Sequence, residues 1–193
     1  MKLRLILLYS VLALFLPVSS SAVLGSAQTR DHLTPEEVDL VKDSQALDLR
    51  VAVLVKAIDR RLGVITGAGP GTEKEQKQQK KDSEKWGELP TGNRAELVAD
   101  IAKILDEAIT NIDDVSARDE KNPLIPKALR NLAAETTRVM DQLSPLQQQA
   151  KSEAEIASFQ MLSENVEPIL EATKKLPPPT EKKEKKGTKK DPN

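Results

Sequence analysis

The 193-residue sequence contains no cysteine, one histidine and four aromatic residues. The missing cysteine excludes disulfides, thiolate metal sites and a cysteine nucleophile. A single histidine leaves no room for a histidine-based metal site, and any histidine-dependent triad would have to use His32, which we expect to be a solvated surface residue. Trp86 and Phe159 are the only aromatics after residue 16, too few for a platform that stacks nucleic-acid bases. We therefore predict no catalytic, cofactor-binding or metal-binding residues, no cofactor, no enzymatic activity and no nucleic-acid partner.

The N-terminal residues have the pattern of a cleavable secretory signal peptide. A basic start, MKLR, precedes an apolar run from Leu5 to Leu16, and small residues follow Pro17. The alternative, an uncleaved membrane anchor, would need about 20 apolar residues, and this run has about 12. Cleavage is expected after Ala27, or else after Ala22. We predict that residues 1–27 are removed and that the mature chain, without a membrane span, is secreted to the bacterial periplasm or cell envelope.

The first predicted helix follows a strong start signal. The string TPEE at 34–37 supplies an N-cap threonine, a proline in the first turn and a glutamate that completes a capping box. Apolar residues then recur at helical spacing, which predicts one helix over 35–62, about 42 Å long. Arg60 and Arg61 would lie in its last turn, where cations suit the helix dipole, and Gly63 would end it.

Residues 63–92 change in character. Glycines and a proline are followed by a stretch of Lys, Glu and Gln with almost no apolar residue. Such a composition buries too little surface to offset its ordering entropy, so we predict a long flexible, low-complexity loop. Trp86 is the exception in this loop. We expect it to fold back onto the protein as an anchor, with an exposed partner contact as the alternative.

Two more helices follow at clear signals. Asn93 and Glu96 form a capping box, and the apolar stripe behind them predicts a helix that ends near 116–120. A third helix is expected to end near Leu143, because Ser144 precedes a proline and that position disfavours helical geometry.

A fourth helix and a basic tail complete the chain. Ser144 would cap the helix, with Gln147 as its capping-box partner, and Pro168 would kink it. Residues 177–193 are rich in lysine and proline and are predicted to be disordered. The predicted fold class is therefore all-α: an antiparallel helical bundle of about four helices over 28–176, with coiled-coil-like packing.

Acidic residues are the remaining candidates for chemistry. The stretch 111–122, NIDDVSARDEKN, gathers oxygen ligands that calcium would accept, but it lacks the spacing of a calcium-binding loop, so we expect a plain acidic connection. The other acids are expected on solvent faces rather than on apolar stripes. An enzyme built on carboxylates alone would need two of them in one pocket with shifted pKa values.

Two short strings share a pattern. LTPEE at 33–37 and LSPLQ at 143–147 both fit Leu-Ser/Thr-x-x-Gln/Glu, which is similar to the repeated motif of Spy-type periplasmic stress chaperones. The first copy ends in Glu rather than Gln, and this body is acidic where the cradle of that family is basic. The resemblance covers ten residues, and we assign no family from it. It implies one alternative function, a periplasmic chaperone or stress-sensing helical protein.

The leading prediction for function is an exported, non-enzymatic helical bundle that acts through surface contacts with an unknown protein or with the cell envelope. The mature chain has 27 basic and 30 acidic residues, and the tail after 180 has six lysines against three acids. A second alternative is therefore a module that uses this lysine-rich tail to bind the envelope or an anionic polymer. Long amphipathic helices also make a homo-oligomer a possible state.

Overall fold

The protein is all-α, as the sequence predicts. The computed structural model describes residues 31–67 and 83–177, in which there are helices and connections but no strand. The chain divides between Arg30 and Asp31, and all described residues belong to the second unit. The predicted signal peptide, residues 68–82 of the predicted loop and the tail beyond 177 lie outside the described residues.

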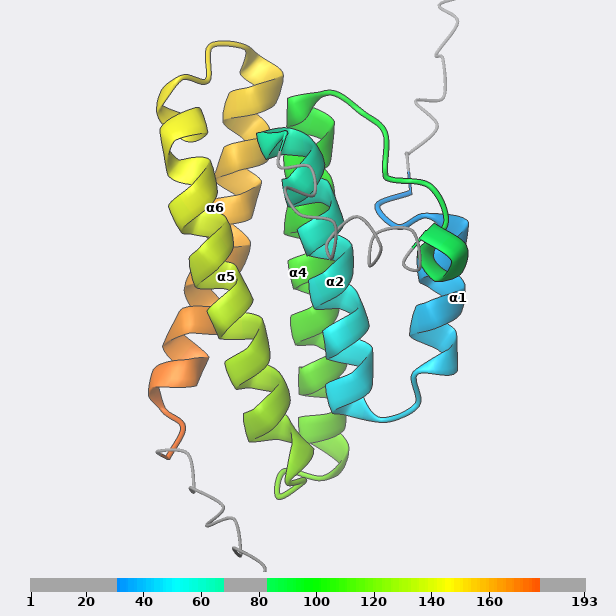
Figure 1. The fold of residues 1–193 in the computed structure, drawn as a ribbon. Helices are drawn as coiled ribbons and strands as arrows, with labels where there is room; N and C mark the ends of the chain where they lie inside the picture. The colour runs from blue at the N-terminus through cyan, green and yellow to red at the C-terminus, as the bar shows by residue number, and fades with distance from the viewer. Residues whose placement is uncertain (1–30, 68–82, 178–193) are drawn as a thin grey trace, which may run out of the picture. The chain divides into compact units, whose positions relative to one another are not determined.

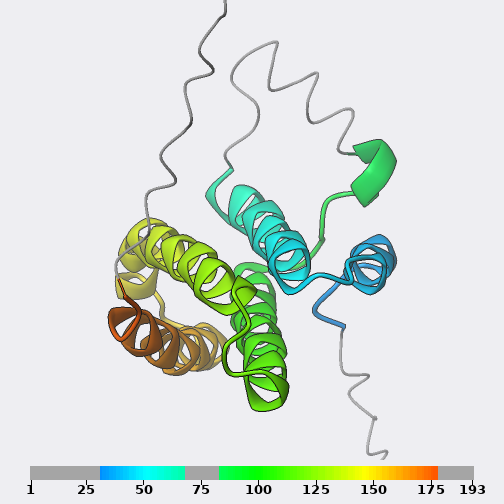
Figure 2. The same cartoon turned by 90° about the horizontal axis from the view of Figure 1, so that it is seen from below.

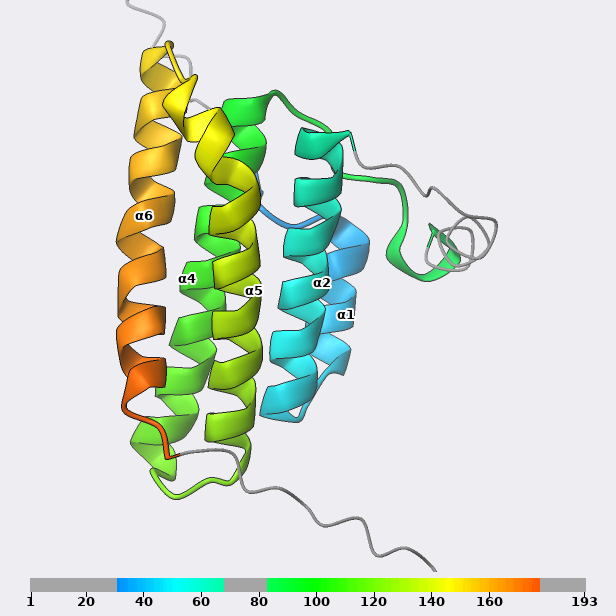
Figure 3. The ribbon, with the colours of Figure 1, turned by 60° about the vertical axis from the view of Figure 1, so that its left-hand side comes forward.

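Five helices carry the fold, and a further helical turn covers 83–86. Helix α4 packs against α2, α5 and α6, and α5 also packs against α2 and α6 (Figures 1 and 3). Helix α1 packs against α2 alone among these helices, and it lies at the edge of the group when viewed along the helices (Figure 2). The helices are α1 (Pro35–Asp43), α2 (Leu47–Thr66), α4 (Arg94–Arg118), α5 (Leu124–Gln148) and α6 (Glu153–Lys174).

The core is aliphatic, because the chain has almost no aromatic residues to contribute. The apolar stripes of α2, α4, α5 and α6 meet in one cluster, in which Phe159 is the only aromatic side chain among the described residues. Alanines on α2, α4 and α5 are buried in this cluster and allow close approach between helices. The largest fully buried apolar side chains are Leu54, Ile58, Leu62, Leu97, Ile101, Ile104, Leu105, Leu132, Leu143, Leu162 and Ile169.

Two of the three predicted capping boxes are confirmed. The Thr34 hydroxyl accepts from the Glu37 amide at 3.3 Å, and the Thr34 amide donates to the Glu37 carboxylate at 2.9 Å. Asn93 and Glu96 make the same reciprocal pair at the start of α4, with distances of 3.0 and 2.8 Å. These local signals are read correctly from the sequence because each involves residues within one helical turn.

The prediction of a single helix over 35–62 is wrong, because the helix is interrupted between α1 and α2. Ser44 and Ala46 both have extended backbone geometry. Side chains satisfy carbonyl groups around the break: Arg50 Nε donates to the Ser44 carbonyl at 3.0 Å, and Gln45 Nε2 donates to the Lys42 carbonyl at 2.8 Å. The break lets α1 fold back along α2.

The predicted end of that helix at Gly63 is also wrong. Helix α2 continues to Thr66, and Gly67 ends it in the left-handed region at φ +66°. Gly63 therefore lies in the helix interior, and the predicted loop begins four residues later than expected. Apolar residues Val64 and Ile65, with Ile65 packed against the core, extend the helix past Gly63.

The proline at 145 does not end the third helix, in contrast to the prediction. Helix α5 runs through Pro145 to Gln148. A proline in a helix interior has no N–H to donate, so the carbonyl of Asp141, four residues before Pro145, loses its helical partner. Asp141 and Pro145 are both exposed, so water can bind that carbonyl instead. Ser144 is thus not a cap. Ser152 caps α6 instead, and its hydroxyl accepts from the Glu155 amide at 3.2 Å.

Two further expectations concern individual residues. The apolar residues at helical spacing predict that Leu49 contributes to the buried side of the first helix, but Leu49 is 58% exposed. Pro168 lies inside α6, as predicted.

No helix within 31–67 or 83–177 combines the length and the apolar character that crossing a membrane requires.

Candidate functional site

Four charged side chains are buried where α1, α2 and α4 meet. Glu37 of α1 is fully buried, and Arg61 of α2 is 1% exposed. Arg60 of α2 and Asp100 of α4 are also buried. We call these four residues the ionic cluster. Two guanidinium groups face two carboxylates, so the formal charges in the cluster balance.

Glu37 is the centre of the ionic cluster. Its Oε1 accepts from Arg60 Nη1 at 2.7 Å and from Arg61 Nη1 at 2.9 Å, and its Oε2 accepts from Arg61 Nη2 at 2.7 Å. The same Oε2 accepts from the Thr34 amide of the capping box. Charge-assisted bonds of this kind are among the strongest in proteins, and here they join the beginning of α1 to the last third of α2.

Arg61 also binds backbone groups from two segments. Nη1 donates to the Ala57 carbonyl at 2.7 Å, and Nη2 donates to the His32 carbonyl at 2.6 Å. Its Nε makes no hydrogen bond within the described part of the chain, and the nearest acidic oxygen, Asp100 Oδ2, is 3.8 Å away. Arg61 therefore connects the residues before α1 to both α2 and α4.

His32 is not the solvated surface residue that the sequence predicts. Its side chain is 28% exposed, and its Nε2 lies 2.8 Å from Oε2 of Glu107 on α4. The physical reason is the bond from Arg61 to the His32 carbonyl, which holds this segment against the protein. Leu33, the next residue, is buried in the core.

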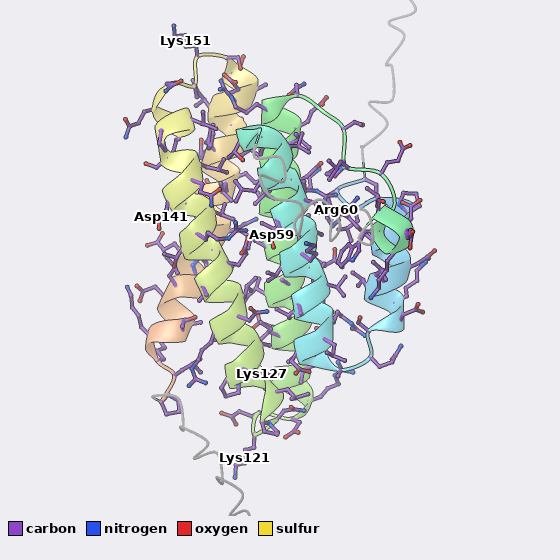
Figure 4. All side chains as sticks on the ribbon, viewed as in Figure 1. Asp59, Arg60, Lys121, Lys127, Asp141 and Lys151 are labelled. Carbon is purple, nitrogen blue, oxygen red and sulfur yellow. The ribbon has the colours of Figure 1, made fainter. Side chains whose placement is uncertain are left out.

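Residues 83–90, near the end of the predicted loop, lie against the ionic cluster, and we call them the Trp86 segment. The Trp86 side chain is 8% exposed, and its ring centre lies 5.7 Å from the Arg60 guanidinium carbon, within range of a cation–π contact. Arg60 Nη2 donates to the Gly87 carbonyl at 3.1 Å and also to the Glu88 carbonyl. In Figure 4, Arg60 lies on the side of α2 that faces this segment and α1. The expectation that Trp86 docks onto the protein is confirmed.

Gly87 offers a direct test of how tightly the Trp86 segment is held. Its φ is +67°, and a Cβ added there would lie 2.6 Å from Cδ of Glu36. We expect Gly87→Ala to destabilise the protein by about 1–2 kcal/mol, through backbone strain plus this contact. Gly67→Ala is the matched control, because Gly67 has φ +66° and no atom of the described residues lies within 4 Å of a Cβ added there. Urea unfolding of both variants should show the larger loss for Gly87→Ala, and equal losses would mean that the contact with Glu36 has no weight.

A second group of charges joins α2 to α5. Arg138 binds Asp59 of α2, and it also donates to Glu135 from Nε at 3.0 Å and from Nη2 at 2.5 Å. Figure 4 shows Asp59 on the side of α2 that faces α5. Glu135 is buried, and burial raises the pKa of its carboxyl from 4.5 to about 7. The nearby Arg138 guanidinium opposes this shift.

The raised pKa of Glu135 predicts how stability depends on pH. The folded protein holds this proton more firmly than the unfolded chain, so the contribution of Glu135 is fully present below pH 4.5 and is lost as the pH rises to about 7. We expect the loss to be on the order of 1–3 kcal/mol, and Glu135→Gln should remove it. Urea unfolding between pH 4 and 8 measures the difference, and a Glu135→Gln curve parallel to the wild type would contradict the expectation.

Glu155 provides a control of opposite sign. The hydrogen bond from Arg94 lowers the pKa of the Glu155 carboxyl. Its contribution to stability is therefore present above the usual range of a glutamate and is lost as the pH falls, so Glu155→Gln should change only the acidic limb of the curve.

Three buried acids differ from the expectation that the acids lie on solvent faces. They are Glu37, Asp100 and Glu135. One signal was present: Arg60 and Arg61 lie between the apolar residues Ile58 and Leu62, so one arginine of the pair had to point inward, and a buried arginine needs an acid.

Residues 111–118 of the predicted acidic connection belong to α4, and 119–122 lie between α4 and α5. The acids that seemed suited to calcium, at 113, 114, 119 and 120, are all exposed. Within the described ranges, no three His, Asp or Glu side chains are grouped as ligands for a metal ion. This stretch therefore gives no geometric reason to place an ion there.

The ionic cluster and the group formed by Asp59, Glu135 and Arg138 differ in the chemistry that they could support. In the ionic cluster, both oxygens of Glu37 are occupied by arginine donors, which makes the cluster suited to holding segments together rather than to moving protons. In the second group, the carboxyl with a raised pKa is bonded to an arginine that also binds Asp59. Comparison of the chain with protein families, with curated proteins and with solved structures finds no match to any of them.

Proposed function

We propose that the protein is exported and that it acts without catalysis, through contacts of its helical surface with another protein or with the cell envelope. The observation that supports this proposal is that the buried charged side chains bind one another. Arg60 and Arg61 donate to Glu37 and to backbone carbonyls, an arrangement that stabilises the fold and leaves these groups occupied.

Export is supported by the sequence of residues 1–27. Its basic start, apolar run and small residues before Gln28 follow the order of a secretory signal. The absence of cysteine is compatible with an oxidising compartment and does not require one. The bacterial periplasm or cell envelope is the destination that we propose.

The finer arrangement of the helices is also an inference. We infer that α2, α4, α5 and α6 work as an antiparallel four-helix bundle. The short connections support it, since 119–123 joins α4 to α5 and 149–152 joins α5 to α6, and short connections favour antiparallel neighbours. The contacts of α4 with the other three helices also support it.

The chaperone alternative is weakened by two observations. The string at 143–147 lies inside α5, so it does not begin a helix as the string at 33–37 does. The large apolar side chains that are exposed in the described residues are spread over α2, the Trp86 segment and α6, whereas a chaperone groove would gather them. These exposed side chains are Leu49, Leu89, Ile156 and Met161.

The tail alternative stays a proposal, because the lysines of 181–193 lie outside the described residues. A matched pair of proteins, the mature chain and the same chain without 178–193, should be compared for binding to anionic vesicles at low and high salt. Binding that is unchanged by the deletion would exclude a role for the tail.

Export is tested by expressing the full chain in a bacterium and sequencing the N-terminus of the accumulated protein. We expect a mature chain that begins at Gln28, because Gly25 and Ala27 place small residues where signal peptidase requires them. A start at Val23 would correspond to the second possible cleavage position. A protein that keeps Met1 and stays in the cytoplasm would contradict the proposal.

A further inference from the structure

Helix α1 is attached to the protein by a small and specific set of contacts. Among the helices it packs against α2 alone. The contacts include the bonds that Arg60 and Arg61 donate to Glu37, together with Val38 and Val41, which pack against the core. Because α1 contacts only α2 among the helices, it could form the same contacts with α2 of a second copy of the chain.

The connection between α1 and α2 has a composition compatible with a helix. It consists of Ser44, Gln45 and Ala46, with neither glycine nor proline. The helical spacing of apolar residues continues through it, which is why the sequence predicts one helix from 35 to 62. The bent form replaces backbone bonds by two side-chain bonds, from Arg50 to the Ser44 carbonyl and from Gln45 to the Lys42 carbonyl. A straight form would recover the backbone bonds.

A straight helix cannot keep the ionic cluster within one chain. Glu37 and Arg60 are 23 residues apart. At 1.5 Å per residue they would be separated by about 35 Å along the helix axis. Glu37 would then lose both arginines, and the buried side chains of Arg60 and Arg61 would lose the Glu37 carboxylate, unless another chain supplies these partners.

We propose that α1 is exchanged between two copies of the chain, in a dimer in which residues 35–66 form one straight helix. In the bent form, Glu37 near the start of α1 meets residues near the end of α2, so these two helices run in opposite directions. Two straight helices that pair in opposite directions would bring Glu37 of each copy to Arg60 and Arg61 of the other. The arrangement is two-fold symmetric, which is the closed symmetry that most dimers have.

The exchange conserves the contacts that each copy makes. Residues 31–34 would move with α1, so that the bonds of His32 to Arg61 and Glu107 would also form between copies. The free-energy difference then comes mainly from the hinge and from association, and protein concentration shifts the balance. The hinge residues 44–46 therefore decide how much dimer forms.

Two hinge variants of the full chain test the exchange. Ser44→Ala/Gln45→Ala raises helix propensity in both copies, and we expect the association constant of the dimer to rise roughly tenfold. Gln45→Pro disfavours the straight helix in both copies and suits the extended geometry of Ser44, so it should lower the association constant of the dimer at least about a hundredfold. Gln147→Ala/Gln148→Ala, on exposed positions at the end of α5, is the control for helix propensity away from the hinge.

Size-exclusion chromatography with light scattering over a range of concentrations gives the result, and circular dichroism shows that each variant is folded. A folded Ser44→Ala/Gln45→Ala variant that stays monomeric at every concentration overturns the proposal. A dimer that forms equally well in the Gln45→Pro variant also overturns it, because that dimer would not need the hinge to straighten.

Discussion

Replacement of Arg61 by methionine is expected to lower the free energy of unfolding by about 3–5 kcal/mol. The side chain is 1% exposed and binds Glu37, the His32 carbonyl and the Ala57 carbonyl. Its removal leaves Asp100 and part of the Glu37 carboxylate buried with less compensation. A small domain is stable by only about 5–15 kcal/mol in total, so this change is a large fraction.

Urea unfolding followed by circular dichroism measures the loss. Arg94→Met is the matched control, because Arg94 also pairs with a glutamate, Glu155, but at a partly exposed position. Such a pair contributes less than about 1 kcal/mol. Equal losses for the two variants would contradict a dominant role for the ionic cluster, whereas a loss confined to Arg61→Met supports it.

Leu54→Ala is expected to cost about 2–5 kcal/mol through lost burial and the cavity that it leaves. Leu54 is fully buried on α2 and belongs to the core shared with α4 and α5. Leu49→Ala on the same helix is the control, since its side chain is 58% exposed and its truncation should cost less than about 0.5 kcal/mol. Thermal unfolding of the pair separates core packing from helix propensity, and similar losses would contradict the assigned orientation of α2.

Local signals in the sequence predicted much of the fold. Thr34 with Glu37 and Asn93 with Glu96 start helices where the capping-box pattern placed them. The apolar stripe of α4 predicted its buried face, and the scarcity of aromatics predicted an aliphatic core. These predictions succeed because caps and stripes depend on residues a few positions apart.

The errors arise where distant residues decide the geometry. The break at 44–46 exists because α1 gains more by folding back onto α2, where Glu37 meets arginines 23 and 24 residues later, than by continuing the helix. No spacing rule in the sequence encodes that contact. The same holds for His32, whose position depends on Arg61 and on Glu107 of α4.

The proline at 145 shows a different kind of error. The rule that a helix ends before a proline concerns intrinsic preference, and Leu143 and Leu146 on either side pack against the core. Burial of these two leucines favours continuing α5 over ending it. The Trp86 segment shows the opposite error. Its composition predicts a flexible loop, but the Trp86 ring and two backbone carbonyls contact Arg60 and hold the segment against the protein.

The ionic cluster accounts for how the peripheral parts are held. Arg60 bonds α1 through Glu37 and bonds the Trp86 segment through two backbone carbonyls. Loss of this one side chain would release the Trp86 segment, whereas Arg61 would still bind Glu37 of α1. The proposed surface contacts and the proposed exchange of α1 both depend on this attachment, because it determines which faces of α2 are covered.

Acrylamide quenching of Trp86 fluorescence is the most direct measurement of that attachment, since the chain contains no other tryptophan. In the wild type, we expect emission typical of a buried indole and weak quenching. In Arg60→Met, with α2, α4, α5 and α6 still folded by circular dichroism, we expect strong quenching. A wild-type Trp86 that is quenched as freely as tryptophan in solution, or an Arg60→Met variant that quenches like the wild type, would contradict the account.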